Sequence, residues 1–311
     1  MTFKKVVVVG GGVLGSQIAF QTAYCGFDVT ILLRSDASIE RAKVKIDGLK
    51  EIYLSSMEKM KTNKTAYCRG FTSETNLTDN QIDELKMCVE KAYTNIIMTT
   101  NYEEACNNAD LVIESIAEIP KEKEEIYTNL AKYLPEKTII VTNSSTLLPS
   151  QLADSTGRPE KYLAFHFANE IWKFNTVEIM MHSKSNSEYF DILINFAKLI
   201  NMIPLPVLKE QKGYILNSLL VPFLDSALYL WGNDVALPET IDKTWRLATG
   251  SPVGPFQLMD VVGLTTVINI KSMILKSNDP NSIDVKIIKK LKAMADEGKL
   301  GKTSGEGFYK Y

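Results

Sequence analysis

One histidine and one glutamate of this chain have the types and the spacing of a proton-transfer pair. His166 ends the apolar run of LAFHFANE, and Glu178 lies in TVEIM, on the strand expected next. A carboxylate beside a histidine fixes the tautomer of the ring and stabilises the imidazolium, so such a pair can take up and return a proton. The alternative is a histidine that only satisfies its own hydrogen bonds at the edge of the core. The only other histidine is His182.

Polar residues interrupt apolar sequence at two further places. Asn143, Ser144 and Ser145 end the strand expected at TIIVT, and open parallel sheets bind ligands at the carboxyl ends of their strands. Asn217 interrupts the helical pattern YILNSLLVPFL, where it makes either an inward polar contact or an ordinary buried amide. Together these side chains could hold a hydroxyl or carbonyl oxygen beside His166.

A glycine-rich turn near the amino terminus has the spacing G-x-G-x-x-G. Gly10, Gly12 and Gly15 directly follow VVVV and directly precede SQIAFQTAYCG, whose apolar residues have helical spacing. The three glycines allow the tight turn, the approach of a pyrophosphate to the backbone and the close packing of helix on strand. The helix then offers free N–H groups to the phosphates. We therefore predict a dinucleotide site that includes Val13 and Leu14, and a purely structural turn is the alternative.

The second expected strand ends without the acid that usually binds the adenosine ribose. Leu33 stands at the expected position, and Arg34 and Ser35 follow it. A carboxylate there accepts the ribose hydroxyls and repels a 2′-phosphate, whereas a guanidinium and a hydroxyl suit that phosphate. The stretch therefore favours NADP(H) over NAD(H). Two alternatives remain: Asp36 reaches the ribose, or Arg34 is a solvated loop charge.

The first two hundred residues alternate between short β-branched runs and longer helical patterns, which predicts an α/β fold with a doubly wound parallel sheet. A polar segment at about 38–93 predicts a long helical insert. After residue 206 only helical spacing remains, so we predict a dinucleotide-binding domain over 1–206 and an all-α domain over 207–311 that binds substrate and forms a homodimer. Strands are expected at 5–9, 29–33, 96–99, 111–114, 138–142, 162–165 and 176–180.

Composition and charge favour a small-molecule substrate. The 35 lysines and arginines nearly balance the 37 acidic residues, and no block of like charges occurs, so nothing favours nucleic acid or an acidic membrane surface. No apolar run approaches the ~20 residues of a membrane span. We expect a soluble, cytoplasmic protein without metal or disulfides, because its four cysteines are scattered without a CxxC pair or a nearby histidine: Cys25, Cys68, Cys88 and Cys106.

With these motifs in place, the chain resembles the short-chain L-3-hydroxyacyl-CoA dehydrogenases over essentially its whole length, and within them the bacterial diketoreductase branch. The resemblance implies a Rossmann-type first domain and the interconversion of 3-hydroxyacyl and 3-oxoacyl substrates by hydride transfer to a nicotinamide. The matching stretches are VVGGGVLGSQIAFQTA, ADLVIESIAE, TNSSTLLPSQL, HFANEIW, NTVEIM, GYILNSLLVPFLDSA, ETIDKTWRLATGSPVGPF, DVVGLTT and GEGFYKY.

The resemblance also implies a catalytic role for four residues. His166 is then the catalytic base and Glu178 orients it, while Ser145 and Asn217 hydrogen-bond the reacting oxygen. For the cofactor, the resemblance implies that Glu118 holds the nicotinamide amide and that Lys123 contacts the neighbouring ribose. It further implies that Ser145 and Asn169 lie near the nicotinamide. We also expect Asn143 in the cofactor site, because it follows the strand expected at TIIVT.

The chain departs from the family at three places. Leu33 replaces the acid after the second strand, Glu170 replaces the proline of the family's HFFNP, and Thr303 stands where a cofactor-contacting lysine is expected. The CoA contacts of the family lie in the helical insert, where lysines either meet a CoA phosphate or form a solvated helix face, among them Lys59, Lys61 and Lys64. Two rival functions therefore stay open: a CoA-independent reductase of β-keto esters or diketones, and a non-catalytic NAD(P)-binding or structural protein.

Overall fold

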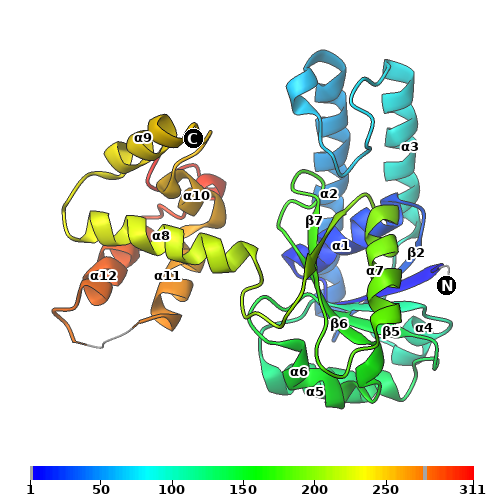
Figure 1. Cartoon of the computed structure of the whole chain (residues 1–311). Helices are drawn as coiled ribbons and strands as arrows, with labels where there is room; N and C mark the ends of the chain where they lie inside the picture. Colours follow the sequence, from blue (N-terminus) through cyan, green and yellow to red (C-terminus); the bar gives the residue numbers. More distant parts are fainter. Residues whose placement is uncertain (1–2, 276–278) are drawn as a thin grey trace. The chain divides into compact units, whose positions relative to one another are not determined.

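The computed structural model describes residues 3–275 and 279–311. The chain forms two compact units, Met1–Ile215 and Leu216–Tyr311, and each is described by itself (Figure 1). The first unit holds the whole sheet, and the second contains five α-helices among its described residues. The boundary predicted at residue 206 falls inside strand β8, Ile203–Val207, whereas the two units divide after Ile215, because the sheet continues through β8.

An eight-stranded sheet forms the middle of the first unit, in the order β3-β2-β1-β4-β5-β6-β7-β8. Its central strands are short apolar runs such as KVVVV and IIVT, which parallel strands covered on both faces require. All seven strands expected from the sequence are present, with ends shifted by at most two residues. They are β1 Lys5–Val9, β2 Asp28–Leu32, β3 Ile97–Thr99, β4 Leu111–Glu114, β5 Ile139–Thr142, β6 Tyr162–Phe167 and β7 Thr176–Met180.

The last two strands depart from the purely parallel sheet that the sequence pattern predicts. Strand β7 pairs with β6 in antiparallel fashion, because residues 168–175 between them form a loop too short for a crossover. Strand β8 runs parallel to β7 at the edge of the sheet. It was not expected because it contains Pro204 and Pro206. The N–H of Ile203 donates to the Asn175 carbonyl just before β7. Because backbone N–H positions alternate between the two edges of a strand, the nitrogens of Pro204 and Pro206 face the open edge of the sheet, where no N–H donor is needed.

Helices cover both faces of this sheet. Val6 and Val8 of β1 belong to one apolar core, and Val7 and Val9 belong to the other, as alternation along a strand requires. The first core includes residues of α1 (Val13–Tyr24), α2 (Asp36–Thr62), α3 (Asp79–Asn95) and α7 (Ser187–Leu199). The second includes residues of α4 (Tyr102–Cys106), α5 (Pro120–Ala131) and α6 (Pro149–Leu152). Short 3₁₀ turns lie at Lys64–Ala66, Ala153–Thr156 and Pro159–Lys161.

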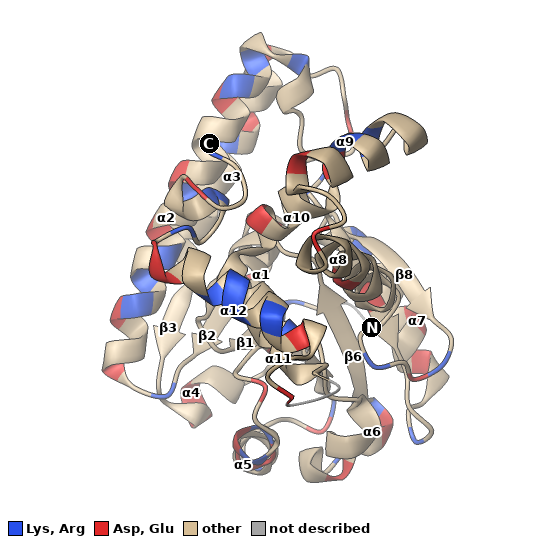
Figure 2. Ribbon diagram, turned by 90° about the vertical axis from the view of Figure 1, so that its left-hand side faces the viewer, with Lys and Arg blue, Asp and Glu red and all other residues tan. Residues whose placement is uncertain are grey.

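The long insert between β2 and β3 is the helix pair α2 and α3, as the sequence predicts. Helix α2 buries a stripe at spacings of three and four residues and leaves charged residues elsewhere, which Figure 2 shows along the ribbon. Helix α3 begins with a capping box in which Thr78 and Gln81 bond each other's backbone. The hydroxyl of Tyr53 in α2 donates to the Gln21 side chain of α1 at 2.7 Å, which ties the insert to the sheet layer.

The second unit packs five helices around an apolar core that includes Leu228, Phe256 and Ile287. Asp242 caps α10 by accepting backbone N–H groups at its start, and Asp260 accepts two N–H groups of the carboxyl-terminal segment. The helices are α8 Leu216–Gly232, α9 Pro238–Thr249, α10 Pro255–Val262, α11 Leu264–Met273 and α12 Ile283–Asp296, and a 3₁₀ turn lies at Lys302–Ser304.

Candidate active site

Strands β6 and β7 place His166 and Glu178 directly opposite each other. Their positions are paired in the antiparallel register, so both side chains leave the same face of the sheet. His166 Nδ1 lies 3.0 Å from Glu178 Oε2, and both residues are buried. A carboxylate can only accept, so Nδ1 of the neutral ring carries the hydrogen. Nε2 therefore keeps the lone pair that can take a proton.

The loop after β5 brings Ser145 to that nitrogen. The Ser145 hydroxyl oxygen lies 3.1 Å from His166 Nε2. Glu118 holds the loop, because its carboxylate accepts hydrogen bonds from the Ser144 hydroxyl at 2.6 Å, the Ser145 N–H at 2.8 Å and the Thr146 hydroxyl at 3.1 Å. Glu118, expected from the resemblance to bind the nicotinamide amide, thus lies one hydrogen bond away from the serine beside the histidine.

Tyr214 completes the surroundings of the histidine, and the sequence pattern gave no reason to select it. Its ring stacks on the His166 ring with centroids 4.3 Å apart and an angle of 6° between the planes. Its hydroxyl donates to the Ser144 carbonyl at 2.7 Å, and the N–H of Ile215 donates to Glu178 Oε1 at 2.8 Å. Burial raises the pKa of the Tyr214 phenol well above its ordinary value, and Glu118 and Glu178 add to this, so the hydroxyl stays protonated.

Asn217 is the fourth residue that the resemblance implies for catalysis. It lies in the first turn of α8, in the second unit, and is half-buried. The first unit thus brings Ser145, His166 and Glu178 together by itself, and the contact of Asn217 with the reacting oxygen stays a prediction.

The glycine turn between β1 and α1 has the steric requirements that its spacing predicts. Gly10 has a φ of +107°, and a Cβ there would lie 2.5 Å from the Ser115 carbonyl oxygen. A Cβ on Gly15 would lie 2.2 Å from the Gly10 carbonyl oxygen. Around Gly12 there is open space within 4 Å, and Val13 in the first turn of α1 is 62% exposed. Backbone therefore excludes side chains at two glycines, whereas the third leaves room for a ligand.

Two asparagines expected in the cofactor site lie around the same edge of the sheet. Asn143 accepts the Phe167 N–H at 2.9 Å and donates to the Ser115 hydroxyl at 3.3 Å. The Asn169 side chain accepts from Gln17 of α1 at 2.9 Å. The loops after β4, β5 and β6 are thus tied to one another and to the helix that begins at the glycine turn.

Lys123 is fully buried, which its expected contact with a ribose did not suggest. Its ammonium group lies 2.6 Å from Glu114 Oε1, and neither side chain is exposed. The other oxygen of Glu114 accepts from the hydroxyls of Tyr127 at 2.6 Å and Thr142 at 2.8 Å. The ion pair thus lies at the carboxyl end of β4, under the loop that carries Glu118, and its ribose contact stays a prediction.

Comparison with known proteins places this chain in a family. The model for the NAD binding domain of 3-hydroxyacyl-CoA dehydrogenase matches residues 5–211, and the model for the C-terminal domain of the same enzyme matches residues 213–311. The chain belongs to the 3-hydroxyacyl-CoA dehydrogenase family. This family member is accordingly an oxidoreductase of CH–OH groups that uses a nicotinamide cofactor.

Three similar proteins illustrate the range of this family. The dehydrogenase is 32% identical to the human mitochondrial hydroxyacyl-coenzyme A dehydrogenase, over 99% of this chain and 91% of the relative. It is 27% identical to a 3-hydroxybutyryl-CoA dehydrogenase of Clostridioides difficile, over 99% of each chain. A solved diketoreductase structure, described as showing substrate-directed dual catalysis of dicarbonyl compounds, covers 100% of both chains with 43% identity and a TM-score of 0.85.

The end of β2 in the dehydrogenase presents cations and hydroxyls to solvent. Leu33 is buried, and a Cβ on Gly11 would lie 2.9 Å from its side chain, so Leu33 packs under the glycine turn. Arg34 and Ser35 are exposed. The side chains that follow form a chain of contacts, in which Ser35 and Ser38 hydroxyls lie 3.0 Å apart and Arg41 donates to Ser38 at 2.9 Å.

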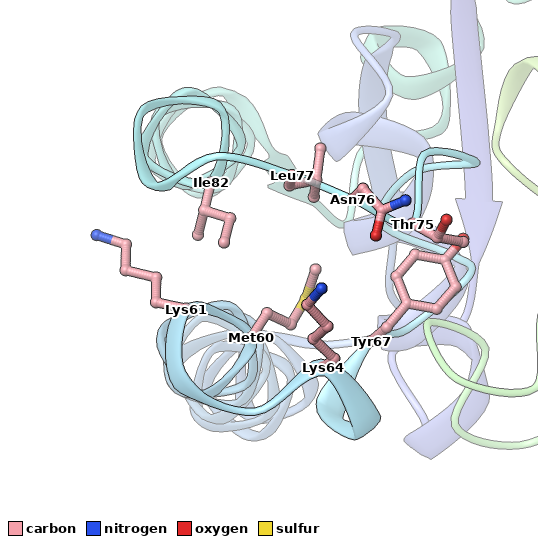
Figure 3. A pocket seen from close by; sticks show the side chains of 8 residues that line it. All are labelled: Met60, Lys61, Lys64, Tyr67, Thr75, Asn76, Leu77 and Ile82. Atoms are coloured by element: carbon pink, nitrogen blue, oxygen red, sulfur yellow. The ribbon is translucent and has the colours of Figure 1, made fainter.

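The structure also describes the segment of Glu170 and Trp172, which departs from the family's motif, and the lysine-rich end of the helical insert. Glu170 has a φ of +53°, and Trp172 is buried against Tyr53 of the insert and the backbone of Gly70. At the end of the insert, a cavity of about 170 Å³ lies between α2 and the start of α3 (Figure 3). Its lining is Met60, Lys61, Lys64, Tyr67, Thr75, Asn76, Leu77 and Ile82, and Lys61 is ion-paired with Asp83 at 2.6 Å.

No helix within residues 3–275 or 279–311 has the length and apolar character to cross a membrane.

Proposed function

We propose that this chain interconverts a 3-hydroxyacyl and a 3-oxoacyl compound. In the oxidation, His166 Nε2 takes the proton of the 3-hydroxyl while the hydride on the same carbon moves to the nicotinamide, so that the C–O single bond becomes a carbonyl. In the reduction, the protonated ring returns the proton to the forming alkoxide. The observation that carries this proposal is the buried pair His166 and Glu178, 3.0 Å apart, with the half-buried Ser145 hydroxyl 3.1 Å from the other ring nitrogen.

Two substitutions test the acid–base pair. His166→Ala and Glu178→Gln are each expected to lower kcat by at least ~100-fold, because general acid–base help is lost or misdirected. The chain offers a matched control in its second histidine, since His182→Asn changes a buried ring whose Nε2 bonds Pro159 instead. Near-normal turnover in either dyad variant, with protein that is folded and binds cofactor, would exclude this mechanism.

We propose a CoA thioester as the acyl carrier, on the basis of the relatives that are named as hydroxyacyl-CoA and hydroxybutyryl-CoA dehydrogenases. A second candidate is the reduction of diketones or β-keto esters without CoA, which the 43% identity with the diketoreductase supports. Steady-state kcat/KM for acetoacetyl-CoA and for ethyl acetoacetate separates the two. A higher value for the ester would reject the thioester and favour the second candidate.

We propose that NADP(H) is the preferred cofactor. Arg34 and Ser35 supply a guanidinium and a hydroxyl at the end of β2, and Ser38 and Arg41 extend this cluster. Arg34→Asp is expected to reverse the ratio of kcat/KM for NADPH over NADH. Arg246→Asp, an equal change of charge at an exposed position of the second unit, is the control. A wild-type preference for NADH would refute the assignment.

We also propose that the protein is a cytoplasmic homodimer, with the segment 207–311 serving both substrate binding and dimerisation. The four cysteines are free thiols, as is usual in a reducing compartment. The second unit carries large exposed apolar side chains, among them Leu219, Leu247 and Met273. Light scattering coupled to size exclusion should give about twice the mass of one chain, and a monomer at micromolar concentration would contradict this.

A further inference from the structure

Tyr214 and Ile215 contact both members of the histidine–glutamate pair and the loop beside it. The Tyr214 ring covers the face of the imidazole, the Tyr214 hydroxyl holds the Ser144 carbonyl, and the Ile215 N–H holds the second oxygen of Glu178. One oxygen of Glu178 is thus held by the imidazole of His166 and the other by the backbone N–H of Ile215. We propose that Tyr214 is a positioning residue, which together with the Ile215 N–H clamps the orientation of His166 and Glu178 for proton transfer.

The backbone conformation supports a dedicated role for this segment. Gly213 has a φ of +81° and Tyr214 has a φ of +55°, so two consecutive residues are left-handed. This conformation is costly for a bulky aromatic residue, and it persists only where the surroundings hold it. Its result is that the Tyr214 ring lies on His166 while the next N–H points to Glu178. The strained backbone of Tyr214 is therefore what brings its ring onto His166 and the next N–H onto Glu178.

Burial explains why the stack should act on orientation. Tyr214 is 1% exposed and His166 is 5% exposed, so the imidazole has a rigid wall on one face. The hydrogen bond to Glu178 restricts where Nδ1 points but leaves the ring free to rock about that bond. A parallel ring 4.3 Å away opposes this rocking and keeps Nε2 directed at Ser145. A misplacement of about 1 Å at a reacting group can cost on the order of 100-fold in rate.

Three variants test the clamp, which rests on the proposed oxidoreductase reaction. Tyr214→Leu removes the stacked ring, and kcat is expected to fall about 10- to 100-fold while KM changes less than about 3-fold. Tyr214→Phe keeps the ring and removes the hydroxyl that donates to the Ser144 carbonyl, so it should retain kcat within about 5-fold. Tyr24→Leu is the matched control, because Tyr24 is also a buried tyrosine of the first unit that donates to a backbone carbonyl, that of Phe71.

The outcomes separate positioning from folding. Where Tyr214→Leu and Tyr24→Leu lose thermal stability to a similar extent, only Tyr214→Leu should lose kcat. Phenylalanine at position 214 should restore kcat, because it restores the stacked ring. If leucine at 214 does not fold, Tyr214→Met takes its place as the variant without a ring. Wild-type kcat in the folded variant without a ring, or equal losses in the leucine and phenylalanine variants, would overturn the clamp. Failure of the reaction itself would show instead as an inactive wild type or an active His166→Ala.

Discussion

Replacing Lys123 by methionine is expected to destabilise the first unit strongly, even without cofactor. The substitution keeps a long unbranched side chain but removes the ammonium group that lies 2.6 Å from Glu114. The carboxylate would stay fully buried and would keep the hydroxyls of Tyr127 and Thr142 and the N–H of Ile116 as donors. These donors soften the loss of the cation, but they cannot neutralise a charge at zero exposure.

The magnitude follows from this incomplete compensation. Breaking a buried ion pair by removing one partner costs roughly 3–5 kcal/mol, and with three remaining donors we expect the lower end, about 3 kcal/mol. At a urea dependence of about 2 kcal/mol per molar, the midpoint of unfolding would fall by about 1.5 M. The double variant Glu114→Gln/Lys123→Met removes the stranded charge as well, so it should recover much of the loss.

Urea titration of the protein without cofactor measures this effect. The chain has tryptophans at 172, 231 and 245, and only Trp172 belongs to the first unit. In a background with phenylalanine at the other two positions, the fluorescence of Trp172 reports the unfolding of the unit that contains the ion pair. A midpoint within about 0.3 M of the parent, or a double variant less stable than Lys123→Met, would refute the reasoning.

Two further predictions concern the glycine turn and the second histidine. Gly15→Ala should destabilise the protein without cofactor, because its Cβ would lie 2.2 Å from a carbonyl oxygen, whereas Gly12→Ala should keep stability and weaken cofactor binding; equal melting temperatures for both would contradict this. Burial lowers the pKa of His182 below its ordinary value of 6.5, so as the pH falls below that value the unfolded chain takes up a proton that the native ring does not. The melting temperature should therefore fall more steeply from pH 7 to pH 5 in the wild type than in His182→Asn, and parallel curves would refute the assignment.

The sequence could predict the parts of the fold that follow from local patterns. Buried parallel strands are near-continuous apolar runs, and the glycine turn and the helix pair of the insert have local signatures, so these elements were predicted within two residues. The direction of β7 depends on loop length, and β8 is stabilised only by its neighbour despite Pro204 and Pro206. Neither property is visible in apolar spacing.

The candidate site was predictable only where a residue type was rare or a motif was specific. His166 stood out as one of two histidines, Glu178 lay on the next expected strand and Ser145 at a strand end, and the family motifs then supplied the expected roles. Tyr214 is one of 13 tyrosines and lies near the carboxyl end of the first unit, where no local pattern marks it. Its proximity to His166 depends on a left-handed backbone that folds its ring onto the imidazole, which is a tertiary property.

The antiparallel pairing of β6 and β7 means that the contact between His166 and Glu178 depends on the register of the sheet. A shift of one residue along either strand would turn Glu178 to the opposite face and separate it from His166 completely. The loop 168–175 that joins the strands also packs Trp172 in the apolar core and holds Asn169 against Gln17, so only its exposed positions Lys173 and Phe174 are free of such contacts. Substitutions at Lys173 and Phe174 should therefore leave the contact between His166 and Glu178 in place, whereas an insertion within β6 or β7 should break it.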